Sequence, residues 1–308
     1  MKTKYKILNI VFLLIGTLAI NAQSVLNAKS PEELRKMREE NVSINSKGDT
    51  IQNADEPLPY GYIEDNDVLW SKVVWEIIDM NEKLNQPYYN SSNGVAYSTL
   101  SLFDALKKGI ESGEIKEVYD DEFFEHKLTP QDALNSLSRT DTTDWYYEQK
   151  DAGVDMSKIQ DNGIDHYPVG SDKVKMIKIK GMWYIDRRLG EMRYRILGLS
   201  MMGPDAQSMG RGFEGADDYV DLFWIWYPDA RKVLNRYKVF NPKNAASKVT
   251  FDDMLNGRRF NTVIYKTSDM VGNRSIDQFI PKDAQAQLEA SRRIKEEILQ
   301  KENEMWNY

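Results

Sequence analysis

The sequence predicts an α+β fold: a central antiparallel meander with flanking helices, an extended N-terminal arm and a C-terminal helix. Apolar and charged residues alternate over 174–197, as they do in half-solvated antiparallel strands. Capping patterns such as Ser101-Leu102-Phe103-Asp104 mark the starts of several helices. The composition, with 41% hydrophobic and 29% charged residues, is that of a globular chain rather than a disordered one.

Residues 1–22 have the pattern of a cleavable signal peptide. A basic stretch precedes an apolar run of 14 residues from Ile7 to Ile20, and small Ala22 stands before Gln23 at the expected cleavage point. A helix that spans a bilayer needs about 20 apolar residues, so this run is too short for an anchor. We therefore expect an exported chain that begins near Gln23 and resides in the periplasm.

Composition excludes several classes of function. There is no cysteine, which rules out disulfides, thiolate metal sites and an acylated N-terminal cysteine, so the chain is not itself a lipoprotein. The net charge of −7 argues against nucleic acid as a partner, because phosphates require a concentrated basic surface. Only two histidines, His126 and His166, are available for catalysis or metal binding.

The mature chain is expected to contain helical and β-rich regions in turn. Apolar residues at helical spacing predict a helix from Val68 to about Asn85, after Asp67 as its cap. Polar residues 141–168 predict mostly loop. The predicted segments are a signal peptide (1–22), an N-terminal arm (23–61), a first, mainly helical lobe (62–168), a β-rich second lobe (169–280) and the C-terminal helix (281–308).

The second lobe is predicted to contain the meander. Its strands are expected at 174–179, 182–186 and 192–197, with a turn at Lys180-Gly181 and a long loop over 199–215. The apolar run 222–227 fits either a buried strand or the start of a helix.

A weak internal repeat suggests two related lobes. Asp79 with Leu84-Asn85 recurs about 150 residues later as Asp229 with Leu234-Asn235. The helix start at Ser101 is matched by one at Thr250, and Val118-Tyr119 is matched by Ile264-Tyr265. An ancient duplication and a coincidence between common helix-start patterns both account for these matches.

No pattern defines a catalytic, cofactor or metal site. The sequence GRGFEG at 210–215 matches a dinucleotide fingerprint but lacks the required strand before it and helix after it. Acidic clusters at 64–67, 120–122 and 217–221 would need to place two carboxylates across a cleft to act as a glycosidase. We expect a non-enzymatic structural protein. A periplasmic glycan-binding module or hydrolase is the alternative, and a chaperone-like carrier is a third hypothesis.

Two groups of residues are candidates for protein interfaces. Trp145, Tyr146 and Tyr147 lie in polar surroundings, and aromatic side chains of this kind form interface hot spots or line a glycan groove. The C-terminal helix has a thin apolar face, which suits either a surface helix or a partner-docking helix. Its candidate residues are Leu288, Ile294, Ile298 and Trp306.

The segment from Asp65 to Asn85, with its two tryptophans, resembles the hallmark stretch of the GldN/PorN family. The leader ending in Asn-Ala-Gln, the sequence WYID at 183–186, residues 193–198 and the tryptophan-rich second half are similar as well. The resemblance covers most of the mature chain.

This resemblance implies a structural role in the type IX secretion system of the Bacteroidetes. It implies a periplasmic ring subunit under the outer membrane, held there by a lipoprotein partner, GldK/PorK, and in contact with the periplasmic part of GldM/PorM. Protein export and gliding motility are the functions it implies, with self-association in the ring and with neither catalytic residues nor cofactors. The absence of cysteine agrees, because the partner would supply the lipid anchor.

Overall fold

The computed structural model describes residues 57, 60–61, 63–89, 100–153, 164–209, 219–239 and 249–305. The chain divides into two units, Met1–Asp55 and Glu56–Tyr308, and every described residue lies in the second. The leader, its cleavage point at Ala22 and Gln23, most of the N-terminal arm, the 210–215 motif and Trp306 lie outside the described residues.

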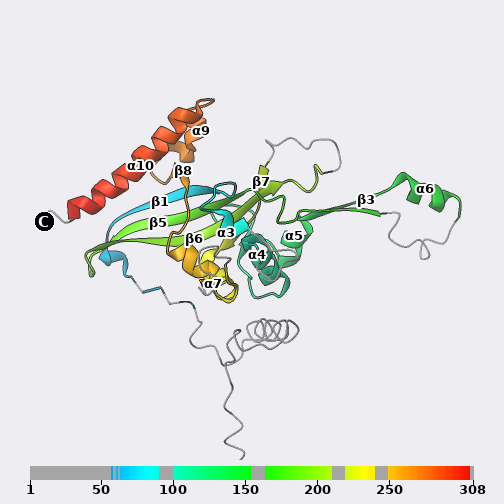
Figure 1. Cartoon of the computed structure of the whole chain (residues 1–308), viewed down its shortest axis with the longest axis horizontal. Helices are drawn as coiled ribbons and strands as arrows, with labels where there is room; N and C mark the ends of the chain where they lie inside the picture. Colours follow the sequence, from blue (N-terminus) through cyan, green and yellow to red (C-terminus); the bar gives the residue numbers. More distant parts are fainter. Residues whose placement is uncertain are drawn as a thin grey trace, which may run out of the picture. The chain divides into compact units, whose positions relative to one another are not determined.

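The second unit is built on a six-stranded antiparallel sheet with the strand order β2-β7-β6-β5-β1-β8 (Figure 1). A separate two-stranded sheet pairs β3 with β4. This arrangement confirms the predicted α+β class. The strands are β1 (Val68–Asp79), β2 (Val118–Tyr119), β3 (Ser138–Thr142), β4 (Ile164–Pro168), β5 (Met176–Asp186), β6 (Glu191–Pro204), β7 (Tyr219–Trp226) and β8 (Val263–Thr267).

The helix starts expected at Ser101 and Thr250 are confirmed by their caps. Ser101 Oγ accepts the N–H of Asp104 at 3.0 Å, and Thr250 forms a complete capping box with Asp253. The helices are α3 (Gln86–Tyr89), α4 (Leu102–Glu111), α5 (Pro130–Asn135), α6 (Asp144–Asp151), α7 (Tyr227–Arg236), α8 (Phe251–Asn256), α9 (Ile276–Phe279) and α10 (Ala284–Met305), with short 3₁₀ turns η3 (Asp65–Asp67) and η5 (Val271–Asn273).

The meander consists of β5, β6 and β7, which pair in sequence order. The expected turn at Lys180-Gly181 is wrong, because β5 continues through these residues with a register shift. A Cβ at Gly181 would lie 2.1 Å from the Tyr194 hydroxyl, so the glycine makes room for a packed ring rather than a turn. The hairpin turns at Gly190, at φ 62°. The predicted loop over 199–215 is also wrong in its first part, since β6 continues to Pro204.

The predicted helix from Val68 to Asn85 is wrong, and most of it forms β1. The error has a physical cause. Val74 and Ile78 are buried on one face, while Trp75 is buried on the other, so apolar residues occupy both faces of the strand. A strand covered on both sides loses the alternation that distinguishes it from a helix.

The sheet order is symmetric about the β5–β6 hairpin, and this bears on the internal repeat. The first echoed segment runs from β1 to β2 and the second from β7 to β8. The last strand of each pairs with the first strand of the other, as β2 with β7 and β8 with β1. The predicted boundary at residue 168 therefore does not separate two cores. The echoed segments exchange strands within one sheet.

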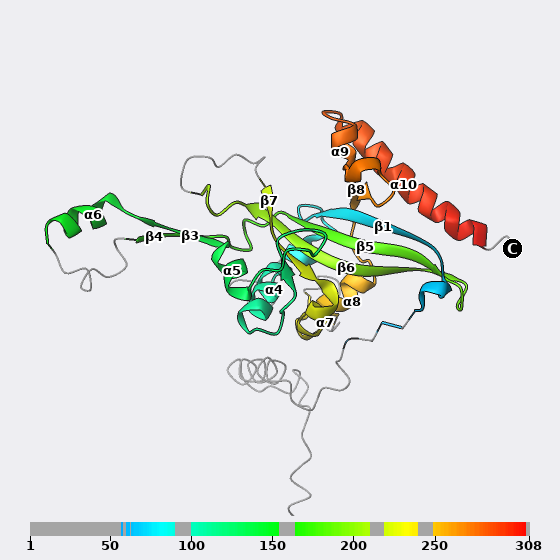
Figure 2. The same ribbon diagram turned by 180° about the vertical axis from the view of Figure 1, so that it is seen from behind.

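One main core lies between the sheet and helices α4, α7 and α8, which lie on the same side of it in Figures 1 and 2. The described end of the N-terminal arm is attached to this layer. The Tyr60 ring lies 4.2 Å from the Arg231 guanidinium, and its hydroxyl donates to Asn256 at 2.7 Å. Burial raises the pKa of Tyr60 to about 12, so the phenol stays protonated as a donor.

The environments of Ile78 and Leu84 give a direct test of the β1 correction. Ile78 is fully buried, whereas Leu84 is 60% exposed. Ile78→Ala should lower the free energy of unfolding by about 2–5 kcal/mol. Leu84→Ala should change it by no more than about 0.5 kcal/mol. Urea denaturation measures both. Equal losses of unfolding free energy at the two positions would instead support the predicted helix, in which both residues lie on one apolar face.

Candidate interaction surfaces

A hairpin arm, made of β3, α6 and β4, projects from the described unit. Its strands pair from Ser138 with Pro168 to Thr142 with Ile164. Figures 1 and 2 both show it running out from α5, away from the six-stranded sheet. The expectation of mostly loop over 141–168 is thus wrong at both ends. A two-stranded ribbon is only marginally stable alone, so an arm of this kind gains stability from packing against another surface.

The base of the arm is fixed by Arg139, whose side chain is 8% exposed. Its guanidinium donates to the carbonyl oxygens of Gln207 at 2.9 Å and Met209 at 3.1 Å, and pairs with Asp141. Because Arg139 is a planar donor with several N–H groups, these bonds fix the direction in which the arm leaves the body.

The tip of the arm is α6, which carries the three aromatic interface candidates. Trp145 is 43% exposed and Tyr147 is 53% exposed, while Tyr146 is half-buried and its ring meets Tyr147 edge-on at 6.0 Å. Of the other tryptophans that the structure describes, Trp75 and Trp224 are buried in the body. The structure thus brings the predicted trio together on one exposed helix.

Several described members of the acidic clusters form ion pairs, namely Asp67, Asp121, Glu122 and Asp221. Glu122 pairs with Lys266, and its carbonyl accepts from Lys180 at 2.9 Å. Asp221 pairs with Lys178 at 2.8 Å. A glycosidase needs two carboxyl groups facing one scissile bond, and these residues instead neutralise lysines on the sheet.

Asp121 organises a tight loop beside His126. Its carboxylate accepts the backbone N–H groups of Phe123 and His126, each at 2.7 Å. Desolvation would raise the pKa of Asp121, but these backbone bonds outweigh it and lower the pKa. A catalytic acid requires the opposite shift. His126 is exposed, 3.2 Å from Asp121, and His166 is exposed on β4.

Sequence reasoning missed a buried ionic network between β1 and the segment after α8. Glu76 is 1% exposed and accepts two hydrogen bonds from Arg258, at 2.8 and 2.9 Å, and one each from Tyr194 and Thr262. Burial would raise the pKa of Glu76, but Arg258 and the two hydroxyls lower it. The sequence signal that could have revealed this network was Glu76 itself, a single charged residue within the apolar run 73–78.

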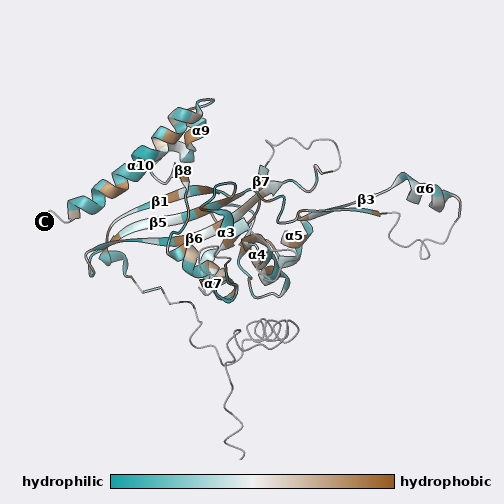
Figure 3. Ribbon diagram, in the orientation of Figure 1, coloured by the Kyte–Doolittle hydropathy of each residue, from teal (hydrophilic) through white to brown (hydrophobic). Residues whose placement is uncertain are grey.

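The C-terminal helix α10 uses two of its candidate residues within the chain. Ile298 is buried and Ile294 half-buried in a small cluster with Val74 and Ile264. Ser291 Oγ accepts the N–H of Ile264 at 2.8 Å, so the helix covers the edge strand β8. Figure 3 shows α10 as largely hydrophilic with interspersed apolar residues.

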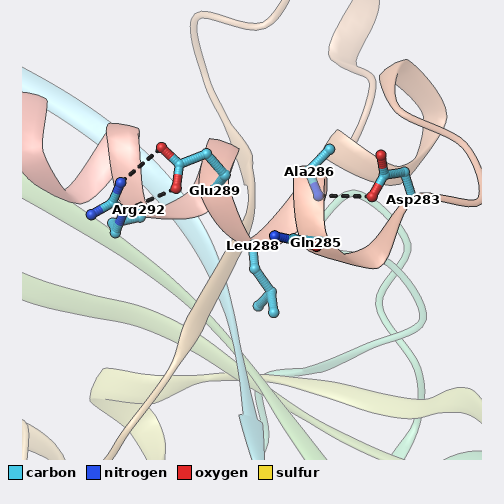
Figure 4. Close-up of a pocket in the computed structure, with 6 residues that line it drawn as sticks. All are labelled: Asp283, Gln285, Ala286, Leu288, Glu289 and Arg292. Atoms are coloured by element: carbon cyan, nitrogen blue, oxygen red, sulfur yellow. Dashed lines mark hydrogen bonds and ion pairs between the residues drawn. The ribbon is translucent and has the colours of Figure 1, made fainter.

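Leu288 is the candidate on α10 that stays exposed, at 55%. It lies in a depression of about 550 Å³ whose six lining residues all come from 283–292 (Figure 4). Glu289 and Arg292 pair across the next turn at 2.8 Å. This is an open surface of one helix, and it presents Leu288 between charged groups.

The described part of the chain contains no group of three or more acidic or histidine side chains placed to hold a metal ion. None of its helices has the length and apolarity that a membrane span requires.

The described residues define an α+β protein with a six-stranded main sheet, a projecting two-stranded arm and a helix that covers the β8 edge of the main sheet. Comparison with protein families matches residues 63–307 to the family described as gliding motility associated protein GldN. The chain therefore belongs to the GldN family, as its sequence resemblance indicated. No curated protein matches it.

The Glu76–Arg258 pair predicts a specific pH dependence. Because the folded pKa of Glu76 is lowered, its stabilisation is present above the unfolded pKa of about 4.3 and is lost as pH falls through the folded pKa. Arg258→Met should cost about 3–5 kcal/mol at pH 7, because it leaves a buried carboxylate unpaired. Glu76→Gln should flatten the acid side of the stability profile. Urea denaturation from pH 3 to 7 measures both, and an unchanged profile in Glu76→Gln contradicts the assignment.

Proposed function

We propose that the chain is a non-enzymatic structural subunit of the type IX protein secretion system, required for protein export and gliding motility. In this proposal the leader directs it to the periplasm. There it self-associates in a ring associated with the outer membrane, bound to the lipoprotein GldK/PorK and to the periplasmic domain of GldM/PorM. Membership of the GldN family over residues 63–307 is the observation that carries the proposal.

The arm supports a role in assembly. Its fixed base at Arg139 and its exposed Trp145 and Tyr147 present large apolar side chains away from the core. Such residues dominate the binding energy of protein interfaces when a partner covers them. The lack of cysteine excludes an acylated N-terminal cysteine, so a lipoprotein partner would supply an anchor of that type.

Affinity purification of the tagged chain from envelopes in mild detergent tests the proposal. We expect an outer-membrane lipoprotein in near-stoichiometric amount, within a particle much larger than the 35.7 kDa chain. Mass spectrometry and sedimentation measure these quantities. Recovery of a lone monomer would contradict the proposal and favour the glycan-binding alternative.

The arm gives a second prediction. Trp145→Ala with Tyr147→Ala should weaken particle assembly about tenfold or more, since hot-spot residues contribute about 2 kcal/mol or more each. The melting temperature should hardly change, because both side chains are exposed. Leu69→Ala with Leu189→Ala, at two other exposed apolar positions, is the matched control. An equal loss of assembly in the arm variant and in the control variant would indicate a general effect of surface hydrophobicity and contradict a specific role of the arm.

A further inference from the structure

Helix α6 at the tip of the hairpin arm is acidic as well as aromatic. Its eight residues include three carboxylates and one lysine. Asp144, Glu148 and Asp151 are all exposed, and no ion pair of theirs is found among the described side chains. The tip thus combines two exposed aromatic rings with a net negative charge, which suits a surface that presents lysine or arginine.

The outer side of the α4–α7 layer has the complementary character. The two helices approach closely at Gly109, where a Cβ would lie 3.0 Å from Val233 Cγ1. The chain neighbours of these two residues, Lys108 and Lys232, are exposed. Lys116 is also exposed. It lies beside α7, because its backbone N–H donates to Asp229 at 2.7 Å.

Two of the acidic groups near these lysines have hydrogen-bonding partners within the chain. Asp229 accepts the backbone N–H groups of Lys116 and Glu117, and Glu114 pairs with Arg236 at 2.8 Å. Glu111 remains as an exposed carboxylate on α4. Lys108, Lys116 and Lys232 are exposed on or beside α4 and α7, and we call these three residues the lysine surface.

We propose that the arm tip of one copy docks on the lysine surface of a second copy. Lysine ammonium groups then lie against the Trp145 and Tyr147 rings and pair with Glu148 and Asp151. Figures 1 and 2 show α6 away from α4 and α7 of its own chain, so the contact is made between copies.

The two surfaces of this contact are unlike, so it is a heterologous contact. Repetition of a heterologous contact closes a ring or propagates a filament, depending on the rotation between neighbouring copies. The inference rests on the proposed function, because it assigns surfaces to the self-association of the ring.

A charge-exchange experiment tests it on the full chain purified from envelopes. The arm variant is Glu148→Lys with Asp151→Lys, and the surface variant is Lys108→Glu with Lys232→Glu. Each should weaken self-association about tenfold, and the loss should shrink at high salt. Combining all four substitutions should restore most of the wild-type association, because the charges are exchanged across one contact. Sedimentation over a concentration series gives the association constants.

The control for the arm variant is Asp120→Lys with Glu125→Lys, which makes the same change in net charge as the arm variant at two exposed positions outside the arm. It should leave association unchanged. The inference is overturned if either charge set has no effect, or if the combined variant recovers nothing. In that case, retention of the lipoprotein in a large particle leaves the ring proposal standing. If the wild-type chain neither self-associates nor retains a lipoprotein, both proposals fail.

Discussion

The pairing of β1 with β5 is the constraint on which the rest of the described structure depends. It joins 68–79 to 176–186 in antiparallel register, with one irregularity near Val68. Closing so long a chain segment costs entropy that only extensive burial and hydrogen bonding offset. On its other edge β1 pairs with β8, and α10 packs against β1 and β8. β5 pairs with β6 and so joins β1 to the meander. The buried Glu76–Arg258 pair fastens β1 to the segment that follows α8.

Local signals in the sequence located the caps at Ser101 and Thr250, but they mistook β1 for a helix and did not predict α6. Ser101 and Thr250 cap their helices through bonds that span three residues, so short windows of sequence contain them. β1 depends on partners about a hundred residues away, and its burial on both faces removed the period that identifies a strand. The glycine at 181 suggested a turn, although its role is to admit the Tyr194 ring.

Of the interface candidates, some are exposed as the sequence indicated and others pack within the chain. The Trp145–Tyr147 trio was recognisable because large aromatics in polar surroundings have no core to enter, and all three lie on α6. The C-terminal helix was placed correctly, but Ile294 and Ile298 pack within the chain, which periodicity alone does not distinguish from docking. The rigid base of the arm was beyond sequence reasoning, because Arg139 binds carbonyl groups near residue 208. Family membership and the arm together favour an assembly role over a catalytic one.

In-cell photocrosslinking tests most directly the central claim, that this chain is an assembly subunit whose arm contacts another copy. A photoreactive phenylalanine analogue replaces Tyr147, which is 53% exposed, in the full chain in living cells. The account predicts a crosslinked species of twice the chain mass whose peptides join α6 to α4 or α7. Crosslinks confined to one chain, or to proteins other than this one, would contradict it.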